Sequence, residues 1–335
     1  MCIRDSTCNW NNLAALDLSE NTALDTLDCS WNRIKALDLA GNKALAKLDC
    51  SQNQLTKLDL TQNTELNVLY CTCNRLAALD LSKNKALTEL YCNINELATL
   101  DLFENTELKV LDCSKNKLIR LDLSENRALA KLDCSRNSLA KLDLSENTAL
   151  TKLFCGYNPL TELDVSRNTK LTELLCHENQ LTALDLTHNT ALATVYCPNN
   201  RLTALDLSKN TALATLACSR NQLTALDLSQ NTAITELYCN NNQLAALDLS
   251  RNTALTELYC NGNRLTTLDL SRNTELTKIY CDDNPLTELN ISNLAKIEEI
   301  VFGDNPEINV IANSQTVVSD LSLIHISEPT RLRCI

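Results

Sequence analysis

The sequence predicts a β-rich solenoid of about fifteen coils of 21 residues, with parallel strands and little or no helix. Fourteen cysteines recur every 21 residues from Cys8 to Cys281. A fixed period of this size is typical of a solenoid, in which each period forms one coil and equivalent positions stack in columns. Apolar and polar residues alternate in short runs such as Leu27-Asp28-Cys29, as expected of half-buried strands. No stretch has the spacing of an amphipathic helix.

Each coil has two halves with the same plan. The stretch from Leu24 to Leu45 follows the pattern L-x-x-L-x-C-x-x-N-x-L and then x-x-L-D-L-S-x-N-T-x-L. Both halves are expected to form short strands, and each turns at an asparagine whose amide can bond backbone groups of its own and the next coil. The predicted structural columns include Cys29, Cys50, Cys71, Cys92, Cys113, Cys134, Cys155, Cys176, Cys197, Cys218, Cys239, Cys260, Cys281, Asn32, Asn53, Asn116, Asn179 and Asn242.

The spacing of the cysteines argues against both disulfides and a metal site. Side chains on in-register parallel strands are separated by about 4.8 Å, whereas the Cβ atoms of a disulfide lie about 3.8 Å apart. The repeats contain no C-x-x-C pair, and the chain has 3 histidines. We therefore expect buried free thiols, no metal and no cofactor. Cys73, at a turn position, is the one repeat thiol expected to be exposed.

The first-half motif is similar to the leucine-rich-repeat consensus. Its 21-residue form with a cysteine column resembles the repeats of internalin J-type bacterial surface proteins, from about Thr7 to Asn305. The resemblance implies a right-handed leucine-rich-repeat solenoid in which the cysteine-half strands line a concave, ligand-binding face. It also implies a secreted or cell-surface protein.

The repeat pattern gives the expected domain boundaries. The solenoid spans residues 7–312, and its last coil, about 286–312, is a degenerate cap. Residues 1–6 and 321–335 resemble the translation of adapter sequence used in sequencing libraries, read in the two directions, and are interpreted as artefacts. Residues 313–320 would then begin a lost downstream segment, and the natural protein would be longer at both ends.

The last coil departs from the repeat at three positions. Asn290 replaces the aspartate, Leu294 occupies the second asparagine column, and Phe302 stands in the place of the cysteine. Atypical terminal repeats act as caps of a solenoid.

Composition excludes several classes of function. The chain has 42 acidic and 30 basic residues, with a net charge of −12, and its basic residues form no stripe, which opposes nucleic-acid binding. No apolar run approaches the roughly 18 residues of a membrane span, so no membrane insertion is expected. With 4 glycines there is no phosphate-binding loop, and His177 and His188 fall in opposite half-coils. We expect no enzymatic activity.

A candidate binding surface follows from comparing the coils with one another. The outward position before each cysteine varies widely and is aromatic in seven coils, although the chain has only 7 Tyr, 3 Phe and 2 Trp. Aromatic side chains are enriched at recognition surfaces, but aromatics on adjacent strands also stabilise a sheet by stacking. The candidate residues are Tyr70, Tyr91, Phe154, Tyr196, Tyr238, Tyr259 and Tyr280, with Trp31 and Tyr157 in a flanking column.

The second half, in contrast, is nearly uniform. Its outward position is an aspartate in thirteen coils, from Asp17 to Asp269. Calcium needs several oxygens that converge on one point, and one carboxylate per coil does not supply them. We expect these carboxylates to accept hydrogen bonds from nearby turn amides or to be solvated.

These observations favour a binding module whose partner is a protein or a carbohydrate. In the full-length protein the module is expected to be a monomer. Two alternatives remain open at this point. One is a structural spacer that displays a terminal domain, and the other is an intracellular or host-delivered regulatory protein.

Overall fold

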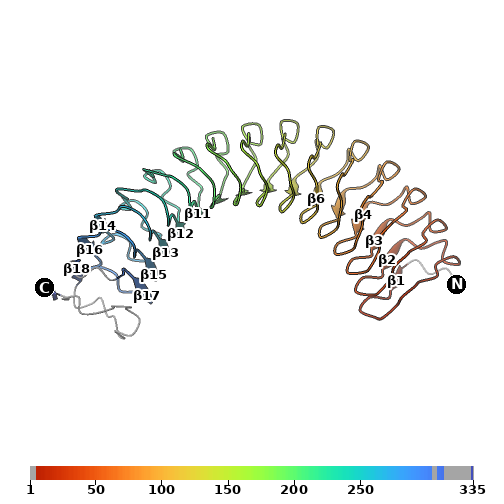
Figure 1. Cartoon of the computed structure of the whole chain (residues 1–335), viewed down its shortest axis with the longest axis horizontal. Helices are drawn as coiled ribbons and strands as arrows, with labels where there is room; N and C mark the ends of the chain where they lie inside the picture. The colour runs from red at the N-terminus through yellow and green to blue at the C-terminus, as the bar shows by residue number, and fades with distance from the viewer. Residues whose placement is uncertain (1–4, 304–307, 313–332, 335) are drawn as a thin grey trace. The chain divides into compact units, whose positions relative to one another are not determined.

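The computed structural model describes residues 5–303, 308–312 and 333–334 (Figure 1). The chain divides into two compact units, Met1–Asn168 and Thr169–Ile335, which are described in turn. Each unit is a stack of coils with parallel strands, and no helix occurs in the described residues. The β-rich solenoid predicted from the sequence is confirmed.

In the first unit, each coil contributes one three-residue strand that pairs in parallel with the strand of the next coil. The register follows the repeat, so that Leu48 stands opposite Leu69. The coils lie farther apart on the second-half side than on the strand side, so the strands occupy the concave side of this unit (Figure 1). The strands are β1 (Asp5–Thr7), β2 (Thr26–Asp28), β3 (Lys47–Asp49), β4 (Val68–Tyr70), β5 (Glu89–Tyr91), β6 (Val110–Asp112), β7 (Lys131–Asp133) and β8 (Lys152–Phe154).

The second unit continues the same plan and adds a second sheet. Its cysteine-half strands are β9 (Glu173–Leu175), β10 (Thr194–Tyr196), β11 (Thr215–Ala217), β12 (Glu236–Tyr238), β13 (Glu257–Tyr259), β15 (Lys278–Tyr280) and β17 (Glu299–Val301). The second sheet has the strand order β14 (Thr267–Asp269), β16 (Glu288–Asn290), β18 (Asn309–Ala312) and β19 (Arg333–Cys334).

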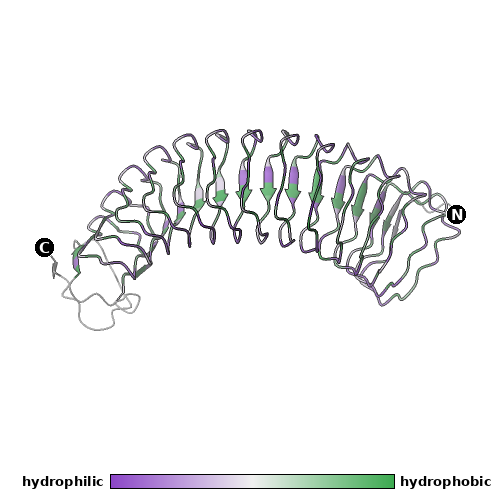
Figure 2. Cartoon of the chain, turned by 45° about the horizontal axis from the view of Figure 1, so that its top comes forward, coloured by the Kyte–Doolittle hydropathy of each residue, from purple (hydrophilic) through white to green (hydrophobic). Residues whose placement is uncertain are grey.

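Leucine and cysteine side chains form the narrow core inside the coils. The middle residue of each cysteine-half strand from β2 onward is buried, and Figure 2 shows the alternation of apolar and polar residues along the strands. Leu48, Cys50 and Leu55 have no solvent exposure. The ladder cysteines from Cys29 to Cys281 are all buried free thiols, as predicted. Burial raises the pKa of Cys29 to about 12, so the thiol stays neutral.

The first-half asparagines satisfy backbone groups at the corner of the coil. Asn53 Nδ2 donates to the carbonyl oxygens of Cys50 and Ser51, both at 3.1 Å. The same group donates to Cys29 O of the preceding coil at 3.0 Å, and Asn53 Oδ1 accepts from the Ile34 N–H at 2.9 Å. The predicted asparagine corner is confirmed, except that it reaches the preceding coil instead of the next.

The prediction of a strand in the second half of each coil is wrong for most coils. Of the described residues, only β14, β16 and β18 form such strands. Elsewhere the amides are bonded within their own coil: the Ser82 N–H donates to Asp80 Oδ1 at 2.9 Å, and the Asn84 N–H donates to Leu81 O at 3.0 Å. The same turn bonds follow β14, where the Ser271 N–H donates to Asp269 Oδ1 at 2.9 Å, so the turn is common to coils with and without a second-half strand.

The second-half asparagines also bond differently from those of the first half. Asn84 Nδ2 donates to the carbonyl oxygens of Leu60 at 3.1 Å and Asn63 at 2.8 Å, both in the preceding coil. Asn84 Oδ1 is buried and has no hydrogen-bond partner. This spine therefore satisfies fewer backbone groups per coil than the first-half spine.

A column of left-handed backbone runs along the first-half turn. Trp31, Ile94 and Tyr157 each have φ of 55°. Gly262 occupies the same column with φ of 64°, and a Cβ atom there would lie 2.6 Å from Asn241 Oδ1. Residues other than glycine pay a small conformational cost for this backbone angle. The packing of the coil keeps the backbone in it.

The last repeat, expected to be a degenerate cap, keeps both of its strands. β17 pairs with β15 and β18 pairs with β16, while Leu294 and Phe302 are buried in place of the asparagine and cysteine. After the last repeat β19 pairs with β18, and at the N-terminal end of the sheet β1 pairs with β2. The expectations for residues 1–4, 304–307, 313–332 and 335 lie outside the described residues.

Candidate ligand-binding surface

The aromatic column lies on the outward side of the cysteine-half strands, as predicted. Each member is the last residue of its strand, next to a buried middle residue. Most rings of the column are half-buried, whereas Tyr196 is 40% exposed. The column therefore presents ring edges and hydroxyl groups to solvent, and Tyr196 presents more of its ring than the others.

Within each unit, neighbouring tyrosines stack face to face. In the first unit the ring centroids of Tyr70 and Tyr91 are 4.6 Å apart. In the second unit Tyr259 stacks on Tyr238 at 4.9 Å and on Tyr280 at 4.5 Å. Stacking at the spacing of adjacent strands fixes the rings and covers most of their faces.

Carboxylates bond the hydroxyl groups of these rings. Tyr238 Oη donates to Glu257 Oε2 at 3.0 Å, and Tyr280 Oη donates to Glu299 Oε1. Glu257 also pairs with Lys278, whose Nζ lies 2.8 Å from Glu257 Oε1. The hydrogen bond to Glu299, followed by burial, raises the pKa of Tyr280 to about 12. The phenols remain neutral hydrogen-bond donors at physiological pH.

In the first unit, basic side chains lie over aromatic rings near the strand face. Arg136 Cζ is 3.8 Å from the ring centroid of Tyr157, and Lys131 Nζ is 5.9 Å from that of Phe154. Lys47 Nζ is 5.7 Å from the centroid of Tyr70. These contacts are within cation–π range, so Phe154 and Tyr157 join a mixed aromatic and basic surface.

Trp31 belongs to a stacked pair that the sequence analysis missed. Its ring lies 4.1 Å from that of Trp10, with the planes inclined by 8°. Trp10 is 69% exposed and Trp31 is 45% exposed. The signal was present in the sequence, because the two tryptophans are 21 residues apart in the left-handed column.

An alanine interrupts the aromatic column of the second unit. Ala217 pairs with Tyr196 on one side and with Tyr238 on the other. A pocket of about 580 Å³ lies at this position, lined by the two tyrosines, Ala217 and polar residues that include Arg220 and Glu236.

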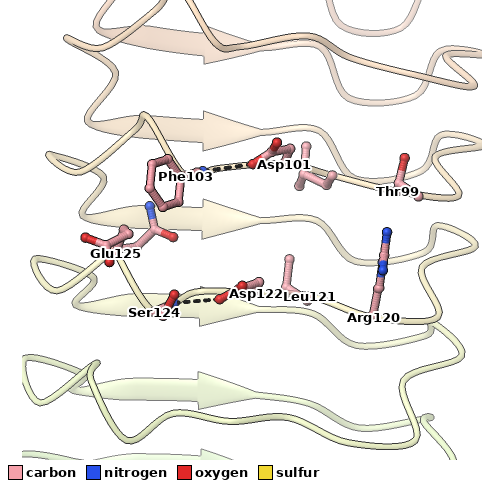
Figure 3. Close-up of a pocket in the computed structure, with 10 residues that line it drawn as sticks. Thr99, Asp101, Phe103, Arg120, Leu121, Asp122, Ser124 and Glu125 are labelled. Carbon is pink, nitrogen blue, oxygen red and sulfur yellow. Dashed lines mark hydrogen bonds between the residues drawn. The ribbon is translucent and has the colours of Figure 1, made fainter.

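The second-half surface of the first unit carries an exposed aromatic that the sequence analysis also missed. Phe103 replaces the usual serine or threonine and is 64% exposed. It borders a pocket of about 660 Å³, together with Asp101, Asp122 and Arg120 (Figure 3).

The aspartate column has the bonding that the sequence analysis expected. The carboxylate of Asp122 accepts the Ser124 N–H at 3.0 Å, and this bond lowers the pKa of Asp122. Figure 3 shows the same bond between Asp101 and the amide of Phe103. These carboxylates therefore cap turns within their own coils.

The other candidate groups offer no assembled reactive site in the described part of the chain. His177 makes an edge contact with Tyr196, with ring centroids 5.1 Å apart, whereas His188 is exposed on the opposite half-coil. Cys73 is half-buried, so the expectation that it is exposed is wrong, and burial raises its pKa. The thiol is hydrogen-bonded to the side chain of Gln52 in the preceding coil. Cys8 is also half-buried.

No group of three His, Cys, Asp or Glu side chains in these described ranges is arranged to hold a metal ion. The same residues include no helix that is long and apolar enough to cross a membrane.

Known structures with the same fold include other cysteine-ladder and leucine-rich-repeat proteins. The functional domain of InlJ from Listeria monocytogenes, which includes a cysteine ladder, is 36% identical to this chain. The match covers 92% of this chain and 68% of that one, with a TM-score of 0.89. Neither a protein-family model nor a curated protein sequence matches the chain.

Two more distant structures share the fold. The leucine-rich-repeat protein LIC12759 from Leptospira interrogans is 24% identical, with coverage of 94% of this chain and 87% of that one and a TM-score of 0.84. The internalin inlF from Listeria monocytogenes is 21% identical, with coverage of 86% and 89% and a TM-score of 0.77.

Proposed function

Because this chain belongs to the internalin J-like family of leucine-rich-repeat proteins with a cysteine ladder, we propose that it is a non-enzymatic ligand-binding module of a secreted or cell-surface protein. Its partner is a protein or a glycan, bound on the outward face of the cysteine-half strands. The negative net charge of −12 and the mixture of carboxylates and basic groups on that face disfavour a polyanionic partner.

The contrast between the two halves of the coil carries this proposal. The second half repeats one aspartate turn with little variation, as a structural element would. The outward position of the first half carries Tyr70, Phe154, Leu175, Ala217 and Tyr259 in different coils, although every coil has the same core. Variation of the outward side chains over a repeated core is expected where those side chains serve recognition instead of packing.

The stacked rings also favour a second candidate, a structural spacer. Tyr238, Tyr259 and Tyr280 contact one another at 4.5–4.9 Å and would stabilise the strand face without any ligand. A spacer would not need the exposed rings of Trp31 or Tyr196, which make the binding module the better explanation.

A selection experiment separates the two functions. The full chain is immobilised and screened against a phage-displayed peptide library and a glycan array. Binding ligands should lose affinity for a triple Tyr→Ser variant at positions 238, 259 and 280. The matched control changes Asp227 and Asp248 to Asn, which alters the opposite side of neighbouring coils and retains a turn acceptor.

Circular dichroism must show that each variant keeps the fold. Ligands that bind the wild type and the triple variant equally would favour the spacer. So would the failure of both the peptide library and the glycan array to give any ligand.

A further inference from the structure

The gap at Ala217 lies where neighbouring coils carry an aromatic ring. Tyr196, Ala217 and Tyr238 occupy equivalent positions of three successive paired strands. The backbones that carry the two tyrosines are therefore two strand spacings apart, about 9.6 Å. One position between two tyrosines has no ring of its own.

The next coils show what such a position accommodates. Tyr238 and Tyr280 are also separated by two strand spacings, and Tyr259 lies between them. Its ring contacts both neighbours, with centroids 4.9 Å and 4.5 Å away. A single planar ring is thus the group that this fold places between tyrosines two coils apart.

The ring contacts of the tyrosines beside the gap are with residues on the far side from it, although Tyr238 Oη also lies 3.5 Å from Glu236 Oε2 of its own strand. Tyr196 contacts His177 of the preceding coil in an edge arrangement, with planes inclined by 82°. Tyr238 stacks on Tyr259 of the following coil and bonds Glu257 there. Tyr196 is also the most exposed member of the column, at 40%.

The pocket at the gap is open to solvent above a buried floor. Its volume is about 580 Å³. Ala217 is 1% exposed, so an entering group contacts the rings and the rim more than the methyl group. The rim carries Thr215, Arg220 and Glu236, whose polar groups can bond a peptide backbone that flanks an inserted side chain.

We propose that the gap between Tyr196 and Tyr238 binds an aromatic side chain presented by a protein partner. This inference rests on the proposed function and specifies the chemistry of one subsite. An aromatic ring can stack on both tyrosines, as Tyr259 does between Tyr238 and Tyr280 in the adjacent stack.

The test uses the full chain and small probes observed by saturation-transfer NMR. The probes are N-acetyl-tryptophanamide, N-acetyl-leucinamide and methyl β-galactopyranoside. The tryptophan amide should bind the wild type more strongly than the other two. Ala217→Tyr fills the gap and should weaken its binding by about tenfold or more.

Two further variants keep the result interpretable. Asp112→Tyr adds a ring beside Tyr91 in the first unit and should leave binding at the gap unchanged. Tyr196→Ser removes one wall of the pocket at an exposed position and should also weaken binding, even if Ala217→Tyr fails to fold. Equal binding of the aromatic and leucine amides, or equal binding by wild type and Tyr196→Ser, would overturn the proposal.

The sugar probe gives a separate outcome. If the galactoside binds at the gap and the tryptophan amide does not, the subsite is specific for a glycan and the inference fails while the proposed function stands. Conversely, if the peptide and glycan screens find no ligand for the strand face, the proposed function fails. That result does not depend on whether the tryptophan amide binds in the NMR experiment.

Discussion

Tyr259 and Tyr280 stack face to face, with ring centroids 4.5 Å apart and planes inclined by 8°. Since Tyr259 also stacks on Tyr238, its ring is held between two others. This contact links the stability of the strand face to the surface proposed to bind a ligand. A substitution there must therefore be tested for both effects.

Tyr259→Ser is expected to lower the free energy of unfolding by about 1–3 kcal/mol, because it removes two ring contacts worth ~0.5–1.5 kcal/mol each. Tyr196→Ser is the matched control, since its ring is exposed and meets only the edge of His177 among the aromatic contacts of the described residues. Urea denaturation measures both. Equal losses would contradict a structural role for the stack.

Asn74→Ala should destabilise the chain more than Asn84→Ala. The first change removes the acceptor of the Leu55 N–H and a donor to Cys50 O and Cys71 O, and we expect a loss of about 3 kcal/mol or more. Asn84 donates two hydrogen bonds but has an unpartnered Oδ1, so its replacement should cost about 1–2 kcal/mol. Urea denaturation of the two variants checks the order. A larger loss for Asn84→Ala would contradict the conclusion that the first-half asparagines contribute more to stability than the second-half ones.

The ladder thiols should be unreactive in the folded chain. In a Cys2→Ser/Cys334→Ser background, we expect a thiol reagent at pH 8 to modify Cys8 and Cys73 slowly, because burial raises the pKa of both. The buried ladder should react only after denaturation. Thiol titration with and without denaturant provides the measurement, and rapid modification of many thiols under native conditions would contradict the packing.

Asp112 and Asp122 should titrate on opposite sides of the ordinary value of 3.8. Burial raises the pKa of Asp112, so its contribution to stability is present below 3.8 and is lost as the pH rises through its folded pKa. The Ser124 amide lowers the pKa of Asp122, so that contribution is present above 3.8 and is lost as the pH falls through its folded pKa.

Asp112→Asn should consequently raise stability at pH 7, because the neutral amide retains an acceptor for the Ser114 N–H. Asp122→Asn, at an exposed turn, should not raise it. Carboxyl NMR titration and urea denaturation at pH 7 test the two statements. An Asp112 pKa below 3.8 would refute the first.

Ile94→Asn should stabilise the chain by about 0.5–1 kcal/mol. Ile94 is β-branched and has φ of 55°, whereas asparagine already occupies this conformation at Asn199 and Asn241. Thermal unfolding measures the change. Gly262→Ala is the opposing control and should destabilise the chain, because its Cβ would approach Asn241 Oδ1. Destabilisation by Ile94→Asn would show that the packing of the isoleucine outweighs its backbone cost.

The sequence predicted the parts of the fold that depend on the repeat period. Cys50 and Asn53 recur in register in neighbouring coils, so their burial and their place at the corner followed from stacking alone. The second half was predicted less well. Leu79-Asp80-Leu81 and Leu268-Asp269-Leu270 have the same alternation and the same aspartate turn bond, but only the second stretch forms a strand, so the alternation alone could not decide between them.

The candidate site was predicted in outline from its variable column. The left-handed turns at Trp31 and Ile94 could not be inferred, since neither residue is a glycine or an asparagine. The sequence shows Ala217 as the one alanine of the column. Only the ring stacks around Tyr238 and Tyr259 in the structure show that the gap there is one ring wide.

The left-handed column has a consequence for how this protein can change over time. Trp31, Cys73, Lys115, Tyr157 and Arg220 all adopt nearly the same backbone angle while the leucines and cysteines beneath them stay alike. Point mutations in that column, and unequal crossing-over by whole multiples of 21 residues, would give new combinations of displayed side chains on an unchanged core. Whole coils can thus be gained or lost without disturbing the packing of those that remain.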